Sequence, residues 1–185
     1  MTEFVLASSS PRRKQLLRNL GIEFETIESE ADENVDMPPH ETVIELSGRK
    51  ATYVAELRPA SVVIGADTIV LHNGIIMGKP ENAQMAFDML KILQGSVHTV
   101  YTGVCVIYNN EKHFGVEMTD VHMCGLSDSE IREYIKTGEP MDKAGAYGIQ
   151  ELGSKFIKRI EGCYFNVVGL PLNLLWGMLK SIHAL

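Results

Sequence analysis

The sequence of 185 residues contains only three cysteines, and these are far apart along the chain. Three is a small and odd number, so neither a disulfide framework nor a CxxC metal site is expected. Cys105, Cys124 and Cys163 each have apolar neighbours, which predicts buried structural thiols. No apolar run approaches the roughly 20 residues of a membrane span. The N-terminus does not resemble a signal peptide, because its basic residues follow a short apolar run, so we expect a cytoplasmic protein without a membrane partner.

The motifs of several large enzyme classes are also missing. No HExxH, GxxxxGK[ST], GxSxG or GxGxxG occurs, so metalloprotease, P-loop, hydrolase-elbow and Rossmann functions lack support. The six histidines are scattered without metal-ligand spacing. A composition with 45% hydrophobic and 22% charged residues is typical of a globular protein. No repeat or linker marks a boundary, so we expect a single domain over residues 1–185.

Basic residues are outnumbered, and the charge is unevenly distributed. The formal net charge is -7, yet residues 1–20 carry a net charge of +3, and residues 21–45 contain nine acids and no base. An acidic chain argues against a long nucleic acid as the partner. The contrast between the two segments indicates either a solvated surface or a site for a metal with an anionic ligand.

Segments rich in β-branched residues alternate with helical patterns, which predicts an α/β fold with a mixed sheet. Strands are expected near residues 4–7, 22–28, 61–71, 97–108 and 113–124. Helices are expected from residue 11, over 41–57 and 81–93, from 127 to 138, and after 171. The helix over 41–57 is expected to place one apolar face inward, formed by Val43, Leu46, Ala51, Val54 and Leu57. The Gly-rich stretch 138–153 is predicted to be the longest irregular segment.

A serine-rich turn precedes the first helix, with Ser10 placed as the N-cap and Pro11 as the first helical residue. Hydroxyls, free amides and the arginines that follow suit phosphate oxygens. A simple Ser-Pro cap with exposed basic residues explains the pattern equally well. Further on, the carboxylates of Glu30, Asp32 and Glu33 could hold a divalent cation, although such a run more often forms a solvated loop.

Three further segments contain candidates for chemistry. Asp67 ends an apolar strand, where a carboxylate is costly unless it has partners. It could bind a metal, act as a general base, or cap the turn that follows. Lys79 lies between a glycine and a proline in a rigid turn, which favours a phosphate contact. In the glycine-containing loop with Lys143, the amide of Gln150 could bind the edge of a base.

The segments LASSSPRR, SEADEN, GRKA, GADTIV, GKP, DKAGAYGIQ and IEGCYFNVVGLPL together strongly resemble the Maf family of nucleoside triphosphate pyrophosphatases. They follow the family's order and spacing over nearly the whole chain. The resemblance implies an α/β fold of the inosine triphosphatase-like type, with a long, curved mixed sheet flanked by helices, two lobes and a central cleft. It also implies hydrolysis of a nucleoside triphosphate to the monophosphate and pyrophosphate, with Mg²⁺ or Mn²⁺ as cofactor, and a tendency to form homodimers.

The resemblance assigns roles to individual residues. The family's polar signature matches Ser8, Arg13, Glu33, Lys50, Asp67 and Lys79. Of these, Asp67 matches the proton acceptor. The positions that separate substrate classes match Arg12, Thr68 and Gln150. The branch acting on 7-methyl-GTP has tryptophan where Arg12 stands and lacks DKAGAYGIQ, so this chain resembles the dTTP/UTP pyrophosphatase branch.

The implied roles agree with the chemistry of the substrate. A triphosphate carries about four negative charges and needs several cations around it. The candidates are Arg13, Lys50, Lys79 and Lys143, with Ser8 and Ser10 as further substrate contacts. A metal on Glu33 and Asp67 would bridge phosphate oxygens and polarise the attacked phosphorus. Whether Asp67 is the metal ligand, the general base or both stays open.

Two alternatives to a pyrophosphatase of ordinary dTTP and UTP remain open. The family name is tied to inhibition of septum formation, so the chain could be a nucleotide-binding regulator of cell division without essential turnover. Modified pyrimidine nucleotides could also be substrates, through the same chemistry. A turnover measurement distinguishes a nucleotide-binding regulator from a pyrophosphatase. A panel of substrates distinguishes modified from ordinary pyrimidine nucleotides as the substrate.

Overall fold

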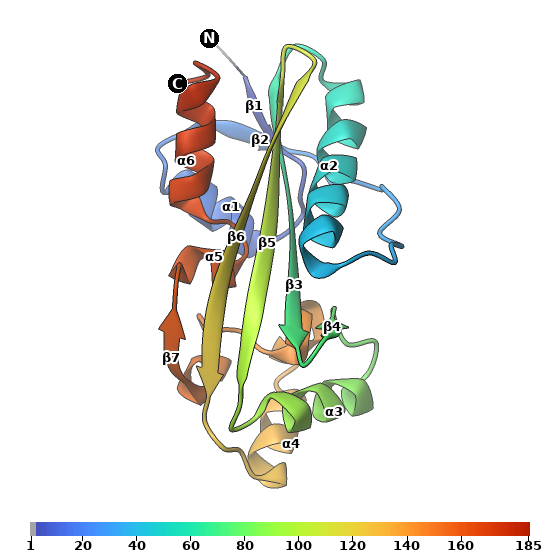
Figure 1. Ribbon diagram of the computed structural model, residues 1–185, viewed down its shortest axis with the longest axis vertical. Helices are drawn as coiled ribbons and strands as arrows, with labels where there is room; N and C mark the ends of the chain where they lie inside the picture. Colours follow the sequence, from blue (N-terminus) through green and yellow to red (C-terminus); the bar gives the residue numbers. More distant parts are fainter. Residues whose placement is uncertain (1–2) are drawn as a thin grey trace. The chain divides into compact units, whose positions relative to one another are not determined.

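The structure is a computed structural model that describes residues 3–185 (Figure 1). The strands are β1 (Phe4–Leu6), β2 (Phe24–Thr26), β3 (Val62–His72), β4 (Ile75–Met77), β5 (Val97–Tyr108), β6 (Glu111–Met123) and β7 (Ile157–Glu161). The α-helices are α1 (Pro11–Arg18), α2 (Pro39–Leu57), α3 (Ala83–Leu93), α4 (Asp128–Lys136), α5 (Tyr164–Val168) and α6 (Leu172–Ser181). Three 3₁₀ helices span Glu139–Asp142, Ala144–Ala146 and Leu152–Phe156.

The strands form one mixed sheet of seven strands, with the order β2-β1-β3-β5-β6-β7 and with β4 paired to β3. β1 is parallel to β2 and β3, whereas β4 is antiparallel to β3 and β7 is antiparallel to β6. The turn between β5 and β6 places Asn109 and Asn110 at φ values of 51° and 65°, a conformation typical of tight hairpins. The predicted α/β fold with a mixed sheet flanked by helices is confirmed.

The chain divides into two compact units. Unit 1 contains the described residues up to Thr68, together with Thr102–Glu117 and Gly169–Leu185. Unit 2 contains Ile69–Tyr101 and Met118–Val168.

In unit 1, α2 packs unusually close to β3 and β5. A Cβ atom at Gly65 would lie 2.5 Å from the carbonyl oxygen of Ser47, and one at Gly103 would meet the main chain of Val43. Glycine at these two strand positions therefore lets the helix backbone approach the sheet directly. This contact sets the distance between α2 and the sheet, and so determines which α2 side chains reach β3.

The other face of the sheet in unit 1 is covered by α6 (Figure 1). The ring of Phe114 in β6 lies against Gly48 of α2, whereas a Cβ atom at the next residue, Gly115, would lie 3.0 Å from Leu174 of α6. Because neighbouring residues of a strand point to opposite faces, α2 and α6 lie on opposite faces of β6. Apolar side chains of the sheet are thereby buried on both faces of this unit.

Unit 2 has its own hydrophobic core. Fully buried side chains of α3 and α4, including Leu90, Leu93 and Ile131, pack with Tyr134 and Phe156. The rings of Tyr134 and Phe156 meet edge to face, with centroids 5.1 Å apart.

Among the described residues, no helix is both long enough and apolar enough to cross a membrane.

Most local predictions are confirmed. Ser10 caps α1, the capping box of Ser127 and Glu130 opens α4, and the predicted α2 face is buried at Val43 and at three of its other positions. The prediction was wrong for Leu57, which is 52% exposed, because it occupies the last turn of the helix.

The prediction for the irregular segments also needs correction. The stretch 138–153 is partly organised by 3₁₀ helices, whereas residues 27–38 form a longer segment without helix or strand. β4, β7 and α5 were not predicted, because they are only three to five residues long. Segments of this length contain too few residues to show a helix or strand periodicity.

The cysteines differ from one another in burial. Cys105 is buried, as predicted, and burial raises the pKa of its thiol to about 12. Cys124 and Cys163 are only partly buried, so for these two the prediction of buried thiols was wrong. Cys124 directly follows β6, and Cys163 lies in the short connection between β7 and α5.

Candidate active site

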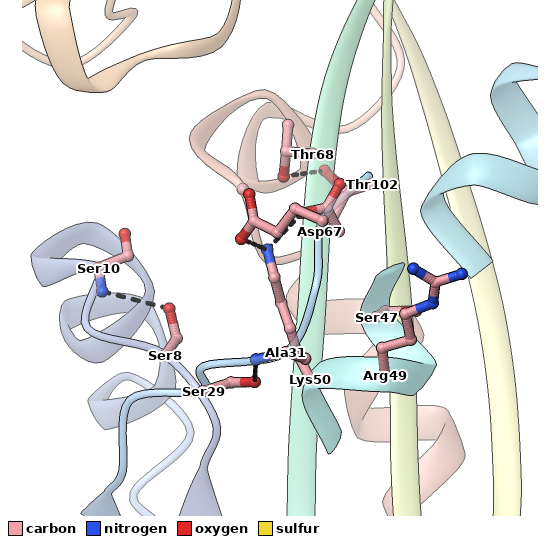
Figure 2. Close-up of polar contacts among 12 residues, drawn as sticks. Ser8, Ser10, Ser29, Ala31, Ser47, Arg49, Lys50, Asp67, Thr68 and Thr102 are labelled. Carbon is pink, nitrogen blue, oxygen red and sulfur yellow. Dashed lines mark hydrogen bonds and ion pairs between the residues drawn. The ribbon is translucent and has the colours of Figure 1, made fainter. Parts of the chain in front are cut away.

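The ammonium group of Lys50 joins two carboxylates. Its Nζ lies 2.6 Å from Oδ1 of Asp67 and 2.7 Å from Oε1 of Glu33, and Figure 2 shows Lys50 directed at Asp67. The side chains of Lys50 and Asp67 are only 12% and 10% exposed, whereas that of Glu33 is 60% exposed. The three predicted residues Lys50, Asp67 and Glu33 therefore form one ion-pair cluster, the Lys50 cluster, which is nearly buried at Lys50 and Asp67 and exposed at Glu33.

The local fold explains why Lys50 and Asp67 meet. Gly65 faces α2, and side chains two residues apart in a strand share a face, so Asp67 faces α2 as well. The close approach at Gly65 brings the middle of α2, which carries Lys50, within reach of β3. A carboxylate in this apolar strand requires a partner, and Lys50 provides it.

The next residue, Thr68, is held on the opposite face of β3. Nη2 of Arg13 donates a hydrogen bond to Oγ1 of Thr68 (3.0 Å), and Nε of the same side chain donates to the carbonyl oxygen of Gly169 (2.9 Å). The hydroxyl of Thr68 also bonds that of Thr102 at 2.9 Å, as Figure 2 shows. Burial lowers the pKa of Arg13, and the charge of nearby Asp67 opposes that effect, so a fixed cation lies beside the cluster.

The serines before α1 accept main-chain hydrogen bonds at the start of this helix. Oγ of buried Ser8 accepts a hydrogen bond from the main-chain N–H of Ser10 at 3.2 Å, and Oγ of Ser10 accepts one from that of Arg13 at 3.5 Å. The second contact is long, so the Ser10 hydroxyl is only weakly engaged. Arg12 is partly buried in the first turn of the same helix. Capping and anion binding are compatible at this helix start.

Three of the predicted site residues, Lys79, Lys143 and Gln150, belong to unit 2. Lys79 is exposed in the loop after β4, whereas Lys143 is buried and donates to a carboxylate oxygen of Asp142 and to the carbonyl oxygen of Glu139, both at 2.7 Å. Gln150 is partly buried. The main-chain N–H of Gly145 donates to the carbonyl oxygen of Gly78 at 3.1 Å, so the loops that carry the two lysines are directly joined.

A carboxylate that was not predicted from the sequence organises this loop. Glu139 accepts hydrogen bonds from the Tyr134 hydroxyl at 2.8 Å and from the main-chain N–H groups of Leu152 and Gly153 at 2.9 and 3.0 Å. The Tyr134 hydroxyl in turn accepts the N–H of Gly148 at 3.0 Å. These contacts hold both ends of the segment that carries Lys143 and Gln150. Glu139 lies three residues after the end of α4, at the start of a short 3₁₀ helix, and no local pattern there indicates this long-range role.

A buried histidine was also missed. His98 is 2% exposed, its Nε2 lies 2.8 Å from the hydroxyl of Tyr147, and burial lowers its pKa to about 4. Tyr147 belongs to the same Gly-rich stretch, so His98 anchors this stretch from β5. Only the alternation of β5 could have predicted that His98 points inward.

Glu33 and Asp67 are the candidate ligands for a divalent cation. No group of three or more His, Cys, Asp or Glu side chains suited to a metal occurs within residues 3–185. Glu33 and Asp67 nevertheless each place an oxygen within 2.7 Å of the same cationic nitrogen. Mg²⁺ is commonly held by one or two carboxylates together with water and substrate phosphates. Two converging carboxylates fit that mode of binding.

Known proteins resemble the chain over almost its full length. A dTTP/UTP pyrophosphatase of Pelotomaculum thermopropionicum is 50% identical, and the alignment covers 98% of this chain and 97% of the relative. A protein of the same name from Thermococcus kodakarensis is 49% identical over 93% of each chain. Both alignments cover more than nine-tenths of this chain and of the relative.

The structure also resembles one that has been solved. The Ham1 protein of Staphylococcus aureus matches with a TM-score of 0.58 at 13% sequence identity, over 97% of this chain and 99% of that chain. At this identity the likeness concerns the fold alone. The family described as Maf-like protein matches residues 3–182. The chain therefore belongs to the Maf-like protein family.

Proposed function

We propose that this protein is a nucleoside triphosphate pyrophosphatase that converts dTTP and UTP to the monophosphate and pyrophosphate. The observation that carries the proposal is the buried pair of Lys50 and Asp67, with Arg13 fixed beside it. Relatives that are about half identical to the chain bear the name dTTP/UTP pyrophosphatase. A buried carboxylate with two neighbouring cations suits attack by water on a polyanion.

In this proposal Asp67 is the general base. Its carboxylate accepts a proton from water as the water oxygen forms a bond to the α-phosphorus. The bond from that phosphorus to the oxygen bridging to the β-phosphate breaks, and pyrophosphate leaves. Arg13 and Lys50 stabilise the negative charge on the phosphate oxygens. Lys79 and Lys143 are proposed as further phosphate ligands, and Ser8 and Ser10 bind phosphate together with the amides of α1.

The proposal includes a divalent cation, Mg²⁺ or Mn²⁺, held by Glu33 and Asp67. When bound it would supply charge neutralisation of the triphosphate and polarisation of the phosphorus. Lys50 lies between these carboxylates and balances their charge, and a contact of its ammonium with a phosphate oxygen is part of the proposal. Removal of the cation with EDTA is therefore expected to abolish turnover and to leave the fold intact.

Base selection is proposed for Arg12, Thr68 and Gln150. The Gln150 amide offers a paired donor and acceptor, which suits the edge of a pyrimidine. Thr68 is fixed by Arg13 and Thr102, so its methyl and hydroxyl groups have a defined orientation. Modified pyrimidine nucleotides that keep this edge are expected to be accepted as well.

The test is a pyrophosphate-release assay across the common and modified triphosphates, with Mg²⁺, with Mn²⁺ and with EDTA. Preferred turnover of dTTP and UTP supports the proposal, and Gln150→Ala and Arg12→Ala are expected to weaken that preference. Nucleotide binding without pyrophosphate release would instead favour a regulator of septum formation. Unchanged base preference in both variants would contradict the assignment of specificity.

The setting of this reaction is also part of the proposal. We place the protein in the cytoplasm, where its substrates are free in solution, and expect a homodimer. Light scattering of the purified chain measures the mass, and a monomer at working concentration would contradict the second expectation.

A further inference from the structure

The loop that carries Glu33 has no regular structure of its own. Residues 27–38 connect β2 to α2 without a helix or strand, and the Glu33 side chain is 60% exposed. Ordering such a segment costs conformational entropy. A carboxylate placed 2.7 Å from Lys50 therefore needs main-chain anchors close to it in the sequence.

Arg49 supplies such anchors. Its Nη1 donates hydrogen bonds to the carbonyl oxygens of Asp32 at 3.1 Å and Asn34 at 3.3 Å. These two carbonyls belong to the residues on either side of Glu33. Nη1 also lies 3.8 Å from the carboxylate of Asp32.

The guanidinium group is itself fixed before it reaches the loop. Its Nε donates to Oε1 of Glu45, one helical turn earlier, at 2.7 Å. The Arg49 side chain is 32% exposed, so more than half of it is covered. A guanidinium can bind a carboxylate and carbonyls at once through separate N–H groups, whereas lysine has a single nitrogen. This geometry suits a residue that holds a main chain in one position.

We propose that Arg49 is a positioning residue that presents Glu33 to Lys50. The inference rests on the proposed function only for the role of Glu33 in turnover. Arg49 and Lys50 are consecutive in α2, so one helical segment holds both the loop backbone and the Glu33 carboxylate. The position of Glu33 thus depends on a residue that is not itself proposed to contact substrate or metal.

A separate contact keeps the loop attached when Arg49 is changed. One turn further along α2, the hydroxyl of Tyr53 donates to Oε2 of Glu30 at 3.2 Å. Loss of Arg49 is therefore expected to loosen residues 32–34 rather than to release the whole loop. The internal bond from the N–H of Asn34 to Oδ1 of Asp32, at 2.9 Å, reports this loosening.

The first measurement is hydrogen exchange of the full chain without nucleotide. Amides of the segment 32–35 are expected to exchange at least several-fold faster in Arg49→Gln, with a smaller increase in Arg49→Lys. Arg58→Gln is the matched control, because Arg58 is also at α2 but pairs with exposed Glu25. Equal exchange at this segment in Arg49→Gln and the wild type would overturn the proposal, and a thermal unfolding curve verifies that each variant is folded.

The second measurement separates positioning from a general structural effect. Arg49→Gln is expected to lower kcat/KM for dTTP by about 10- to 100-fold and to cost little more in a Glu33→Gln background, because both changes remove the same interaction. Full additivity of the two losses would overturn the role of Arg49 at Glu33. If the wild type releases no pyrophosphate, the proposed function fails, while the exchange experiment still decides whether Arg49 orders the loop.

Discussion

Asp67 and Thr68 are consecutive residues of β3 that are held from opposite faces of the sheet, Asp67 by Lys50 of α2 and Thr68 by Arg13 of α1. The alternation of a strand thus places a candidate base and a candidate specificity residue one residue apart with separate supports. A change at one support is expected to leave the other residue in place. The candidate roles in turnover and in base selection can therefore be tested independently.

The first prediction concerns Asp67→Asn. The amide is nearly isosteric with the carboxylate but does not accept a proton, so kcat for dTTP is expected to fall by at least about 100-fold. The Thr68 contacts are unaffected, and the circular dichroism spectrum should match that of the wild type. Steady-state pyrophosphate release measures the effect, and near-wild-type turnover would exclude Asp67 as the base.

The second prediction concerns Lys50→Met, which removes the ammonium between Glu33 and Asp67. The nearly buried Asp67 carboxylate loses its cation, so the free energy of unfolding should fall by about 3 kcal/mol. Millimolar Mg²⁺ is expected to raise the melting temperature of this variant more than that of the wild type, because two carboxylates then face each other without a cation. Thermal unfolding with Mg²⁺ and with EDTA measures both effects.

Lys91→Met is the matched control for that experiment. Lys91 pairs with Asp128 at 2.8 Å, but the two side chains are 41% and 60% exposed. Exposed pairs contribute roughly 0–1 kcal/mol, so this variant should stay close to the wild type in stability and in its response to Mg²⁺. Equal behaviour of the two variants would contradict a special role for the Lys50 cluster.

The parts of the site that the sequence predicts are those set by local patterns. The apolar run before Asp67 indicates the strand, and the Ser-Pro pair locates the start of α1. The distance from Lys50 to Glu33 depends instead on the path of a loop without periodicity, which is set by Arg49. No local pattern indicates where the Lys50 side chain points, and its role is implied only by the family resemblance.

The contacts of Glu139 in unit 2 are a second example of contacts that local sequence patterns do not predict. Its partners are Tyr134 in α4 and main-chain groups 13 and 14 residues further along. No short pattern encodes such pairs, because they form only when the Gly-rich segment folds back. The glycines and the turn residues predict that a loop exists, whereas the side chain that closes it is decided by tertiary packing.

The third prediction concerns Gly65→Ala. The added Cβ would lie 2.5 Å from the Ser47 carbonyl oxygen and 2.8 Å from the amide nitrogen of Ala51, so α2 must move away from β3. We expect a loss of about 3 kcal/mol in the free energy of unfolding and lower turnover, since Lys50 moves with the helix. Gly177→Ala is the control, because nothing lies within 4 Å of its Cβ position in α6, and alanine should stabilise that helix by up to about 1 kcal/mol. A neutral Gly65→Ala would show that the close approach is not required.

The fourth prediction concerns the pH dependence of stability. Burial lowers the pKa of His98 from its ordinary value of 6.5 to about 4. Burial is the main cause of this lowered pKa, the charges of His72 and His122 act in the same direction, and the charge of Asp120 partly opposes them. Between pH 6.5 and 4 the unfolded chain binds a proton at this residue that the folded protein does not bind. The free energy of unfolding should therefore fall as the pH is lowered through this window, by roughly 3 kcal/mol from this residue.

Urea unfolding at pH 7, 5.5 and 4.5 isolates this contribution when the wild type is compared with His98→Gln. Glutamine can keep a hydrogen bond to the Tyr147 hydroxyl but does not titrate, so its stability should fall less steeply with acid. His40→Gln serves as the control, because His40 is exposed and its removal should leave the pH dependence of the wild type. The difference between wild type and His98→Gln should develop between pH 6.5 and 4 and stay constant below that. Parallel curves for the two proteins would mean that His98 accepts its proton without disturbing the core of unit 2.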